Sequence, residues 1–187
     1  MNILRKSLSL KIILAAKLRS AFFFLIIKIF NKDISIYPDI NVGKGVTCRA
    51  TDGGTISIGK GTSIGQNVII EAKGGSIVIG ENIFLGAGCI IVSKERIEIG
   101  SNCQIAEYVV IRDQDHATSS RPIKSAGFKT APIDIGEDVW IGAKATIIKG
   151  SVVGDGSIIG AHSLVRIDIP PFSLAVGIPA KVTKKIA

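Results

Sequence analysis

The residue whose chemistry stands out is His116, one of only two histidines among the 187 residues of the chain. It lies in a polar stretch, residues 112–134, that interrupts an otherwise regular sequence pattern. Irregular stretches of this length within a compact scaffold are usually functional or disordered. An imidazole with a pKa of about 6.5 can take up and release a proton at neutral pH, which suits a general base. A lone histidine is more often structural, so the residue types by themselves leave both roles open.

Two acidic residues, Asp113 and Asp115, precede His116 in the same stretch. A carboxylate that hydrogen-bonds to one imidazole nitrogen fixes the tautomer of the ring, as it does in catalytic triads. Either carboxylate could instead shape the loop. Both residues are therefore candidates for the group that orients His116.

A six-residue repeat must position this polar stretch. Within residues 135–165 an aliphatic residue recurs at every sixth position, and glycine follows it in four of five hexads. A period of six fits neither the 3.6-residue period of a helix nor the two-residue period of a strand. It suits a coil of short strands joined by tight turns, and hexapeptide repeats are typical of the parallel β-helix. The repeated aliphatic residues, predicted to point inward, are Ile135, Ile141, Ile147, Val153, Ile159 and Val165.

The repeat divides the chain into three parts. It begins at Ile34, and extra residues at 73–75 and near Glu95 shift its phase, which predicts turns that bulge outward while the coil continues. After the repeat, prolines that cannot donate to a strand ladder should cap the open end of the stack. We therefore expect a basic apolar helix at residues 1–33, a β-helix at 34–169 with an excursion loop at 112–134, and a capping segment at 170–187.

The N-terminal part carries most of the net charge of +8, because residues 1–33 hold seven Lys or Arg and one Asp. Because the positive charge is concentrated in this one segment, the net charge of the chain does not by itself indicate nucleic-acid binding. Residues 8–30 should be helical, but their longest uncharged run, residues 20–27, is too short to span a bilayer and lacks the features of a signal peptide. One interpretation is a helix that packs on its own coil or on a neighbouring subunit. The other is an interfacial helix on an anionic membrane. For the second, the residues expected in the membrane are Phe22, Phe23, Phe24 and Ile27, with Arg19, Lys28 and Lys32 at the headgroups.

The three cysteines are Cys48, Cys89 and Cys103, an odd number without the spacing of a disulfide framework. Cys89 and Cys103 fall where the repeat requires a small inward residue. They are expected to be buried, reduced thiols of a cytoplasmic protein.

Residues from about Ile34 onward resemble the hexapeptide-repeat acyltransferases, among them the galactoside and maltose acetyltransferases and the branch that O-acetylates bacterial surface polysaccharides. The resemblance implies an all-β fold, the left-handed parallel β-helix. It also implies a homotrimer with active sites between neighbouring subunits, acetyl-CoA as co-substrate, and no metal. The motifs that carry it are the repeat, Asp115-His116, Asp138-Val139-Trp140-Ile141-Gly142, Ile169-Pro170-Pro171 and Gly177-Ile178-Pro179-Ala180.

The same resemblance assigns roles to individual residues. His116 falls on the position of the general base, and a backbone N–H of Gly142 or Ala143 falls on that of the oxyanion donor. The residues implied for coenzyme A are Trp140, Ala143 and Ala161 near the pantetheine arm, with Arg166, Lys181 and Lys184 near the phosphates. Where the galactoside enzymes hold their sugar with Asn and Asp, this chain has Gly86 and Lys94, and Lys94 could attract an acidic acceptor.

We therefore expect an acetyl-CoA-dependent O-acetyltransferase that acts on a sugar hydroxyl of a surface polysaccharide or its precursor. Its expected location is cytoplasmic, with peripheral membrane contact through residues 8–30 left open. An N-acetyltransferase for an amino sugar or nucleotide sugar is the alternative enzyme, and a non-catalytic β-helix scaffold is the alternative without chemistry. A metalloenzyme of the carbonic-anhydrase type needs three histidines per chain, and only His116 and His162 are present.

Overall fold

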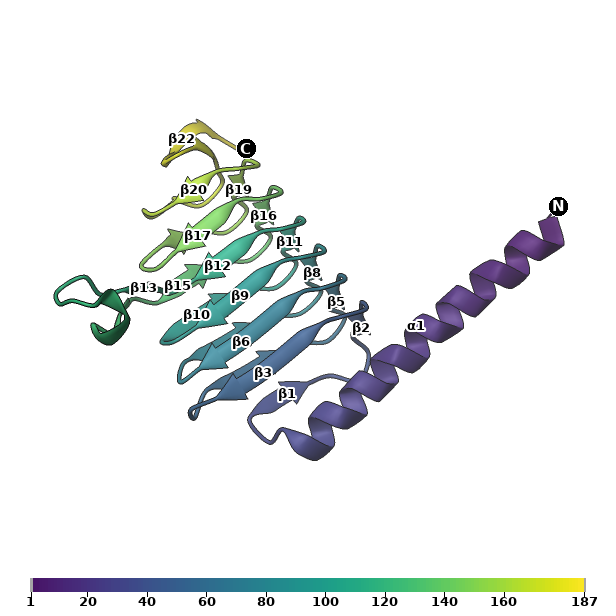
Figure 1. The fold of residues 1–187 in the computed structure, drawn as a ribbon. Coiled ribbons are helices and arrows are strands. Elements are labelled where there is room, and N and C mark those ends of the chain that lie inside the picture. The colour runs from purple at the N-terminus through teal and green to yellow at the C-terminus, as the bar shows by residue number, and fades with distance from the viewer. Residues whose placement is uncertain (1, 187) are drawn as a thin grey trace.

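The computed structural model describes residues 2–186, and these form the predicted left-handed parallel β-helix preceded by one long helix (Figure 1). Helix α1 (Asn2–Phe30) begins six residues earlier than the Leu8 expected from the sequence. Among the described residues, no helix is both long enough and apolar enough to cross a membrane.

The coil is a stack of turns whose strands build three parallel sheets. Sheet A contains β1 (Ile34–Ile36), β4 (Thr55–Ile58), β7 (Ser76–Ile79), β10 (Arg96–Ile99), β15 (Ile133–Ile135) and β18 (Val152–Val153). Sheet B contains β2 (Asn41–Val42), β5 (Ser63–Ile64), β8 (Phe84–Leu85), β11 (Gln104–Ile105), β16 (Trp140–Ile141), β19 (Ile158–Ile159), β21 (Ser173–Gly177) and β22 (Ala180–Lys185). Sheet C contains β3 (Thr47–Thr51), β6 (Ile69–Lys73), β9 (Ile90–Ser93), β12 (Val110–Arg112), β17 (Thr146–Ile148) and β20 (Leu164–Val165).

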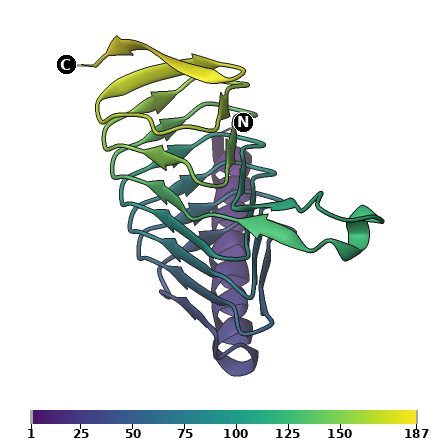
Figure 2. The same cartoon turned by 90° about the vertical axis from the view of Figure 1, so that its left-hand side faces the viewer.

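The chain passes through sheets A, B and C in that order in each turn, so the stack has three edges: A–B, B–C and C–A. The polar stretch leaves at the C–A edge, between β12 and β15, and projects sideways from the stack (Figure 2). It contains an antiparallel hairpin of β13 (Gln114–His116) and β14 (Phe128–Thr130), with a short 3₁₀ helix η1 (Ile123–Ser125) between them. The extra residues at 73–75 and near Glu95 form turns at this same edge, as the phase shifts predicted.

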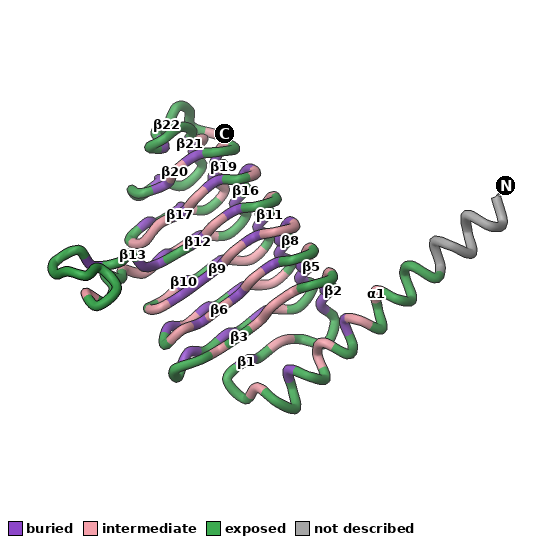
Figure 3. Tube along the Cα trace, in the orientation of Figure 1, coloured by how far each residue is buried: buried purple, intermediate pink, exposed green. Residues whose placement is uncertain are grey.

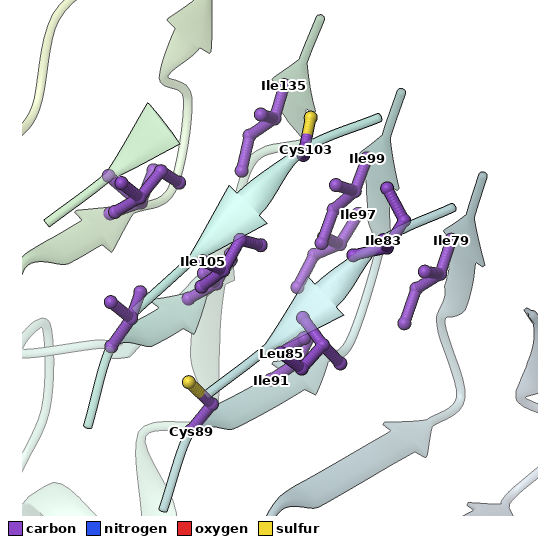
Figure 4. Close-up of a cluster of buried hydrophobic side chains, with 14 of the residues drawn as sticks. Ile79, Ile83, Leu85, Cys89, Ile91, Ile97, Ile99, Cys103, Ile105 and Ile135 are labelled. Atoms are coloured by element: carbon purple, nitrogen blue, oxygen red, sulfur yellow. The ribbon is translucent and has the colours of Figure 1, made fainter. Parts of the chain in front are cut away.

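The core is a set of aliphatic columns that run along the inside of the stack, and the buried residues follow one another up each sheet (Figure 3). All six residues that the repeat predicted to point inward are at most 3% exposed. Equivalent positions in successive turns stack directly, for example Ile99 on Ile135 and Ile111 on Ile147. Figure 4 shows how these columns meet around Leu85 and Ile105. The six-residue repeat in the sequence therefore reflects the packing of the core, because each inward aliphatic residue contacts its equivalents in the turns above and below.

Helix α1 packs its C-terminal half against the first turn of the coil. The Ile27 side chain joins the core, and Ser20 is also buried. The Ser20 hydroxyl accepts a hydrogen bond from the backbone N–H of Val42 at 2.9 Å, and Arg19 Nε donates to the Val42 carbonyl at 2.6 Å. The helix thus satisfies backbone groups of β2 that would otherwise form an open sheet edge. At the other end of sheet B, the β21–β22 antiparallel hairpin follows β19.

This packing corrects the interfacial face expected from the sequence. Ile27 lies in the protein core, Phe23 packs against that core, and Arg19 binds the coil, so these three residues face the protein. Phe22, by contrast, is 64% exposed. Of the residues expected in the membrane, Phe23 and Ile27 therefore face the coil, whereas Phe22 faces outward as expected.

The cysteines are free thiols, as predicted; Cys89 and Cys103 are buried, and Cys48 is half-buried. Desolvation by burial raises the pKa of Cys48 to about 12 and that of Cys89 and Cys103 to about 11. Since the thiolate is the reactive form, all three should be almost unreactive at neutral pH.

We predict that a thiol-reactive dye modifies the native protein only slowly at neutral pH, whereas all three cysteines react after denaturation. Titration of the native protein with the dye, before and after guanidinium is added, measures this. Rapid modification of any cysteine in the native state would contradict the burial described above.

Candidate functional site

His116 sits at the end of β13, opposite Phe128 of β14 in the hairpin register. The His116 side chain is exposed, and its ring lies against the Phe128 ring with centroids 4.6 Å apart. The antiparallel pairing and this ring contact hold the imidazole on an accessible surface. An exposed, supported imidazole can reach a proton on a bound molecule, as a general base must.

Asp113 is fully buried and anchors the start of the hairpin to the preceding turn of the coil. Its carboxylate accepts hydrogen bonds from the Ser93 hydroxyl at 2.7 Å and from the backbone N–H groups of Lys94 and Glu95, each at 2.8 Å. Within residues 2–186 no hydrogen bond joins this carboxylate to His116. The structure thus places Asp113 in the support of the loop that carries His116.

Two ion pairs fix the rest of the loop. Asp115, the other candidate to orient His116, lies 3.3 Å from Lys149 Nζ on the next turn of the coil. Where the chain rejoins sheet A, Arg96 holds Asp134 with two hydrogen bonds of 2.5 and 2.9 Å. Hydrogen bonds to Asp134 and Glu98 raise the pKa of Arg96 above its ordinary value, so the guanidinium stays charged. The loop is therefore held near its entry, at Asp113 and Asp115, and at its exit, at Asp134.

Lys94 lies close to this hairpin, although it comes from the preceding turn. Its ammonium lies 4.4 Å from the centroid of the Phe128 ring, a cation–π contact. Phe128 thus touches both His116 and Lys94, and these three side chains form one surface, which we call the His116 group. Sequence reasoning missed Phe128; the signal that could have found it is a lone aromatic residue within a polar stretch.

Gly86 does not belong to that surface. It is buried at the B–C edge, and a Cβ there would lie 2.5 Å from backbone atoms of Ala106 and Glu107. Two turns of the coil approach so closely at this position that no side chain fits. Gly86 therefore serves the corner of the coil and offers no side chain to an acceptor.

A second group of predicted residues gathers around sheet B and the B–C edge. Trp140 on β16 is 53% exposed and faces outward from sheet B. Ala143 and Ala161 occupy the same corner position in successive turns, since β16 and β19 are paired in register. Lys181 and Lys184 lie on β22, the last strand of that sheet, with exposed side chains. We call these five residues the Trp140 group.

The backbone at this corner changes the choice of oxyanion donor. The Gly142 N–H already donates to the Ile159 carbonyl at 2.8 Å, so it is occupied within the coil. For the N–H of Ala143, no acceptor is found in the part of the chain that the structure describes. Of the two residues expected from the sequence, Ala143 is therefore the one whose N–H has no acceptor within residues 2–186, whereas the N–H of Gly142 is used within the coil.

The two groups do not meet within one chain. The His116 group lies at the C–A edge and the Trp140 group at sheet B and the B–C edge, so the strands of sheet C run between them. Arg166 directly follows β20, in register beside Ile148, and so lies at the C–A end of sheet C, apart from Lys181 and Lys184. One chain therefore presents two separate groups of candidate residues.

Two hexapeptide families match the repeat region. The family described as bacterial transferase hexapeptide (six repeats) matches residues 132–166, and the hexapeptide repeat of succinyl-transferase matches residues 76–111. Among solved structures, the fold is similar to an N-acyltransferase from Bacillus cereus, AntD, in complex with dTDP and coenzyme A. That likeness has a TM-score of 0.71 at 20% identity and covers 87% of this chain and 88% of that one.

Closer relatives share more of the sequence. A protein of Mycobacterium tuberculosis named as a probable acetyltransferase is 38% identical over 160 residues, which are 84% of this chain and 53% of that protein. The chain thus spans about half the length of that relative. WbbJ of Escherichia coli, whose name assigns it to O-acetyl transfer in lipopolysaccharide biosynthesis, is 31% identical over 74% of this chain and 76% of its own length.

A solved structure of an O-acetyltransferase is also similar to this chain in both sequence and fold. A maltose O-acetyltransferase from Clostridium difficile is 31% identical, with a TM-score of 0.62, and the match covers 86% of this chain and 74% of that one. Repeat, fold and sequence identity agree: the chain belongs to the hexapeptide-repeat acetyltransferase family.

Proposed function

We propose that this protein is an acetyl-CoA-dependent O-acetyltransferase that acetylates a sugar hydroxyl of a bacterial surface polysaccharide or its precursor. The observation that supports this most is the division of the predicted site into two half-sites, each complete in its own chemistry. The His116 group offers a base and a cation, and the Trp140 group offers the free backbone N–H of Ala143 and two cations. The names of WbbJ and of the maltose enzyme support an O-linked sugar acceptor.

In this proposal His116 accepts the proton of the acceptor hydroxyl while that oxygen attacks the thioester carbonyl carbon. The carbon–sulfur bond then breaks, and the imidazolium returns its proton to the sulfur. The N–H of Ala143 donates a hydrogen bond to the carbonyl oxygen as negative charge builds on it. A backbone donor suits this task because it is already oriented and does not reorganise during the reaction.

The Trp140 group has the donors that coenzyme A would need. Ala143 and Ala161 have side chains too small to cover their own corners, which are about 4.8 Å apart along the stack, so an extended pantetheine arm can approach the backbone there. Lys181 and Lys184 carry exposed ammonium groups that would pair with phosphates. Coenzyme A would supply the activated acetyl group, and these residues would hold it.

The separation of the half-sites leads us to propose a homotrimer. We also propose a cytoplasmic location, which the three free thiols favour. Three coils packed side by side would bring the C–A edge of one subunit against the B–C edge of the next. Each active site would then combine the His116 group of one chain with the Trp140 group of its neighbour.

The test of the proposed function is acetyl-CoA turnover, measured as free thiol release with a panel of neutral, acidic and amino sugars and short surface glycans. Turnover with hydroxyl acceptors supports the proposal, and the product's mass and its lability to mild base identify an ester. Turnover confined to amino sugars, with an alkali-stable product, would show that the protein catalyses N-acetylation and would contradict the proposed O-acetylation. Failure of the protein to bind acetyl-CoA would favour the alternative that it is a non-catalytic β-helix scaffold.

We predict that Lys94→Ala raises the KM for an acidic acceptor by about tenfold while the KM for acetyl-CoA stays unchanged. A close charge pair at a partly exposed position is worth up to about 1 kcal/mol, and more where solvent is excluded by the acceptor. Lys94→Arg should restore most of the affinity because it keeps the charge. Lys60→Ala, at the A–B edge, removes the same charge away from the His116 group and serves as the control. An unchanged KM for every acidic acceptor tested would exclude this role.

A further inference from the structure

The outward face of helix α1 is apolar and remains uncovered in the isolated chain. Its large side chains recur at spacings of three and four residues, so they lie along one side of the helix. All of them are more than half exposed: Leu14, Leu18, Phe22, Leu25 and Ile29. We call these five residues the outer stripe.

The inner face of the same helix is already used. Ser20 and Ile27 are buried against the first turn of the coil, and Arg19 and Ser20 bind the backbone of Val42. Residues 11–15, by contrast, are all exposed, and Figure 1 shows the helix diverging from the stack toward its N-terminus. The helix is therefore fixed along one face while its opposite face, together with its free half, points away from the protein.

The charges on this helix decide what could cover the outer stripe. Residues 1–32 contain no Asp or Glu at all. Lys17 and Lys28 are eleven residues apart, three helical turns, so they lie on the same flank of the helix, and both are exposed. Lys11 is also exposed and precedes Leu14 by three residues. A second copy of this helix would bring the same cations together without a single partner carboxylate, whereas an anionic surface would neutralise them.

We infer that the outer stripe docks on an anionic phospholipid surface, with α1 lying in the plane of the interface. The apolar side chains would enter the boundary between headgroups and acyl chains, and the lysines would reach the phosphates. The coil, attached through the inner face, would then be carried close to the membrane. This inference does not depend on the reaction that the protein catalyses.

The test is co-sedimentation of the full-length protein with mixed phosphatidylglycerol–phosphatidylcholine vesicles and with pure phosphatidylcholine vesicles. We expect binding to the anionic vesicles that weakens as salt is added, and little binding to the neutral ones. The double variant Leu18→Glu/Phe22→Glu should bind at least about tenfold more weakly, because burial of each large apolar side chain is worth about a factor of ten or more. Lys17→Gln/Lys28→Gln should weaken binding to anionic vesicles while the protein stays folded.

Phe172→Glu is the matched control, because it makes the same change at a Phe that is 55% exposed at the opposite end of the coil. It should leave vesicle binding unchanged. Equal binding by wild type and the Leu18→Glu/Phe22→Glu variant would overturn the inference, and so would equal binding to neutral and anionic vesicles. The inference is also wrong if the wild type does not bind vesicles and the Leu18→Glu/Phe22→Glu variant has a lower molecular mass in solution than the wild type. That result would show that the outer stripe contacts a second copy of the chain.

Discussion

Replacing His116 by alanine is expected to lower kcat for acetyl transfer by about 10²- to 10⁴-fold, the usual contribution of a positioned general base. The affinity for acetyl-CoA should change little, because the pantetheine arm and the phosphates are proposed to bind the Trp140 group of the neighbouring chain, whereas His116 would act only at the reacting acetyl end. Thiol release under saturating substrates gives kcat, and calorimetric titration of acetyl-CoA gives its Kd.

The matched control for this change is the other histidine. His162→Ala removes an exposed imidazole from the B–C edge, where the residue contributes a backbone hydrogen bond from its N–H to the Ala143 carbonyl. That backbone bond survives the substitution, so most of kcat should be retained. Wild-type kcat in the His116→Ala variant would rule out His116 as the base, and equal losses in both variants would point to a general effect on the fold.

Replacing Asp113 by alanine is expected to lower the free energy of unfolding by about 2–4 kcal/mol. The side chain is fully buried, and its loss leaves the Ser93 hydroxyl and two backbone N–H groups without acceptors. Each orphaned buried donor costs about 1–3 kcal/mol, with partial recovery by entry of water. Guanidinium unfolding measures the change.

The same variant should also lower kcat, because Asp113 ties the strand that carries His116 to the turn at residues 93–95. Asp113→Asn keeps an acceptor oxygen and should recover part of both losses. Asp115→Ala is the comparison at an exposed site: its ion pair with Lys149 is open to solvent, so a change under about 1 kcal/mol is expected. If the Asp113 and Asp115 variants were equally stable, the buried anchor would have no special importance.

The sequence predicted the coil well because one physical constraint acts on every turn. An inward position such as Ile147 must match the residues above and below it, so the repeat can be read directly as burial. The start of α1 at Asn2 was less predictable, because helix propensity changes gradually there and no capping motif marks it. The face of α1 that meets the coil was misjudged for a related reason: the helix is apolar on both sides, so its pattern did not identify the inner one.

The sequence indicated which residues were candidates for the site, but it predicted only part of the contacts that these residues make. Asp113 and Asp115 look equivalent beside His116, yet one is buried under the turn at residues 93–95 and the other is paired with Lys149. Nothing in the local sequence separates them, because the difference arises from residues about twenty positions earlier and over thirty positions later in the chain. The choice between Gly142 and Ala143 likewise required the backbone hydrogen bonds of the corner.

The strand register on either side of the excursion loop shows how the coil accommodates inserted residues. Ile99 still stacks on Ile135 and Ile111 on Ile147, although residues 113–132 separate β12 from β15. A corner can therefore grow without disturbing the turns above and below it, so the scaffold is modular. In such an architecture the length and composition of one loop can drift toward a new acceptor while the folding of the support remains under separate selection.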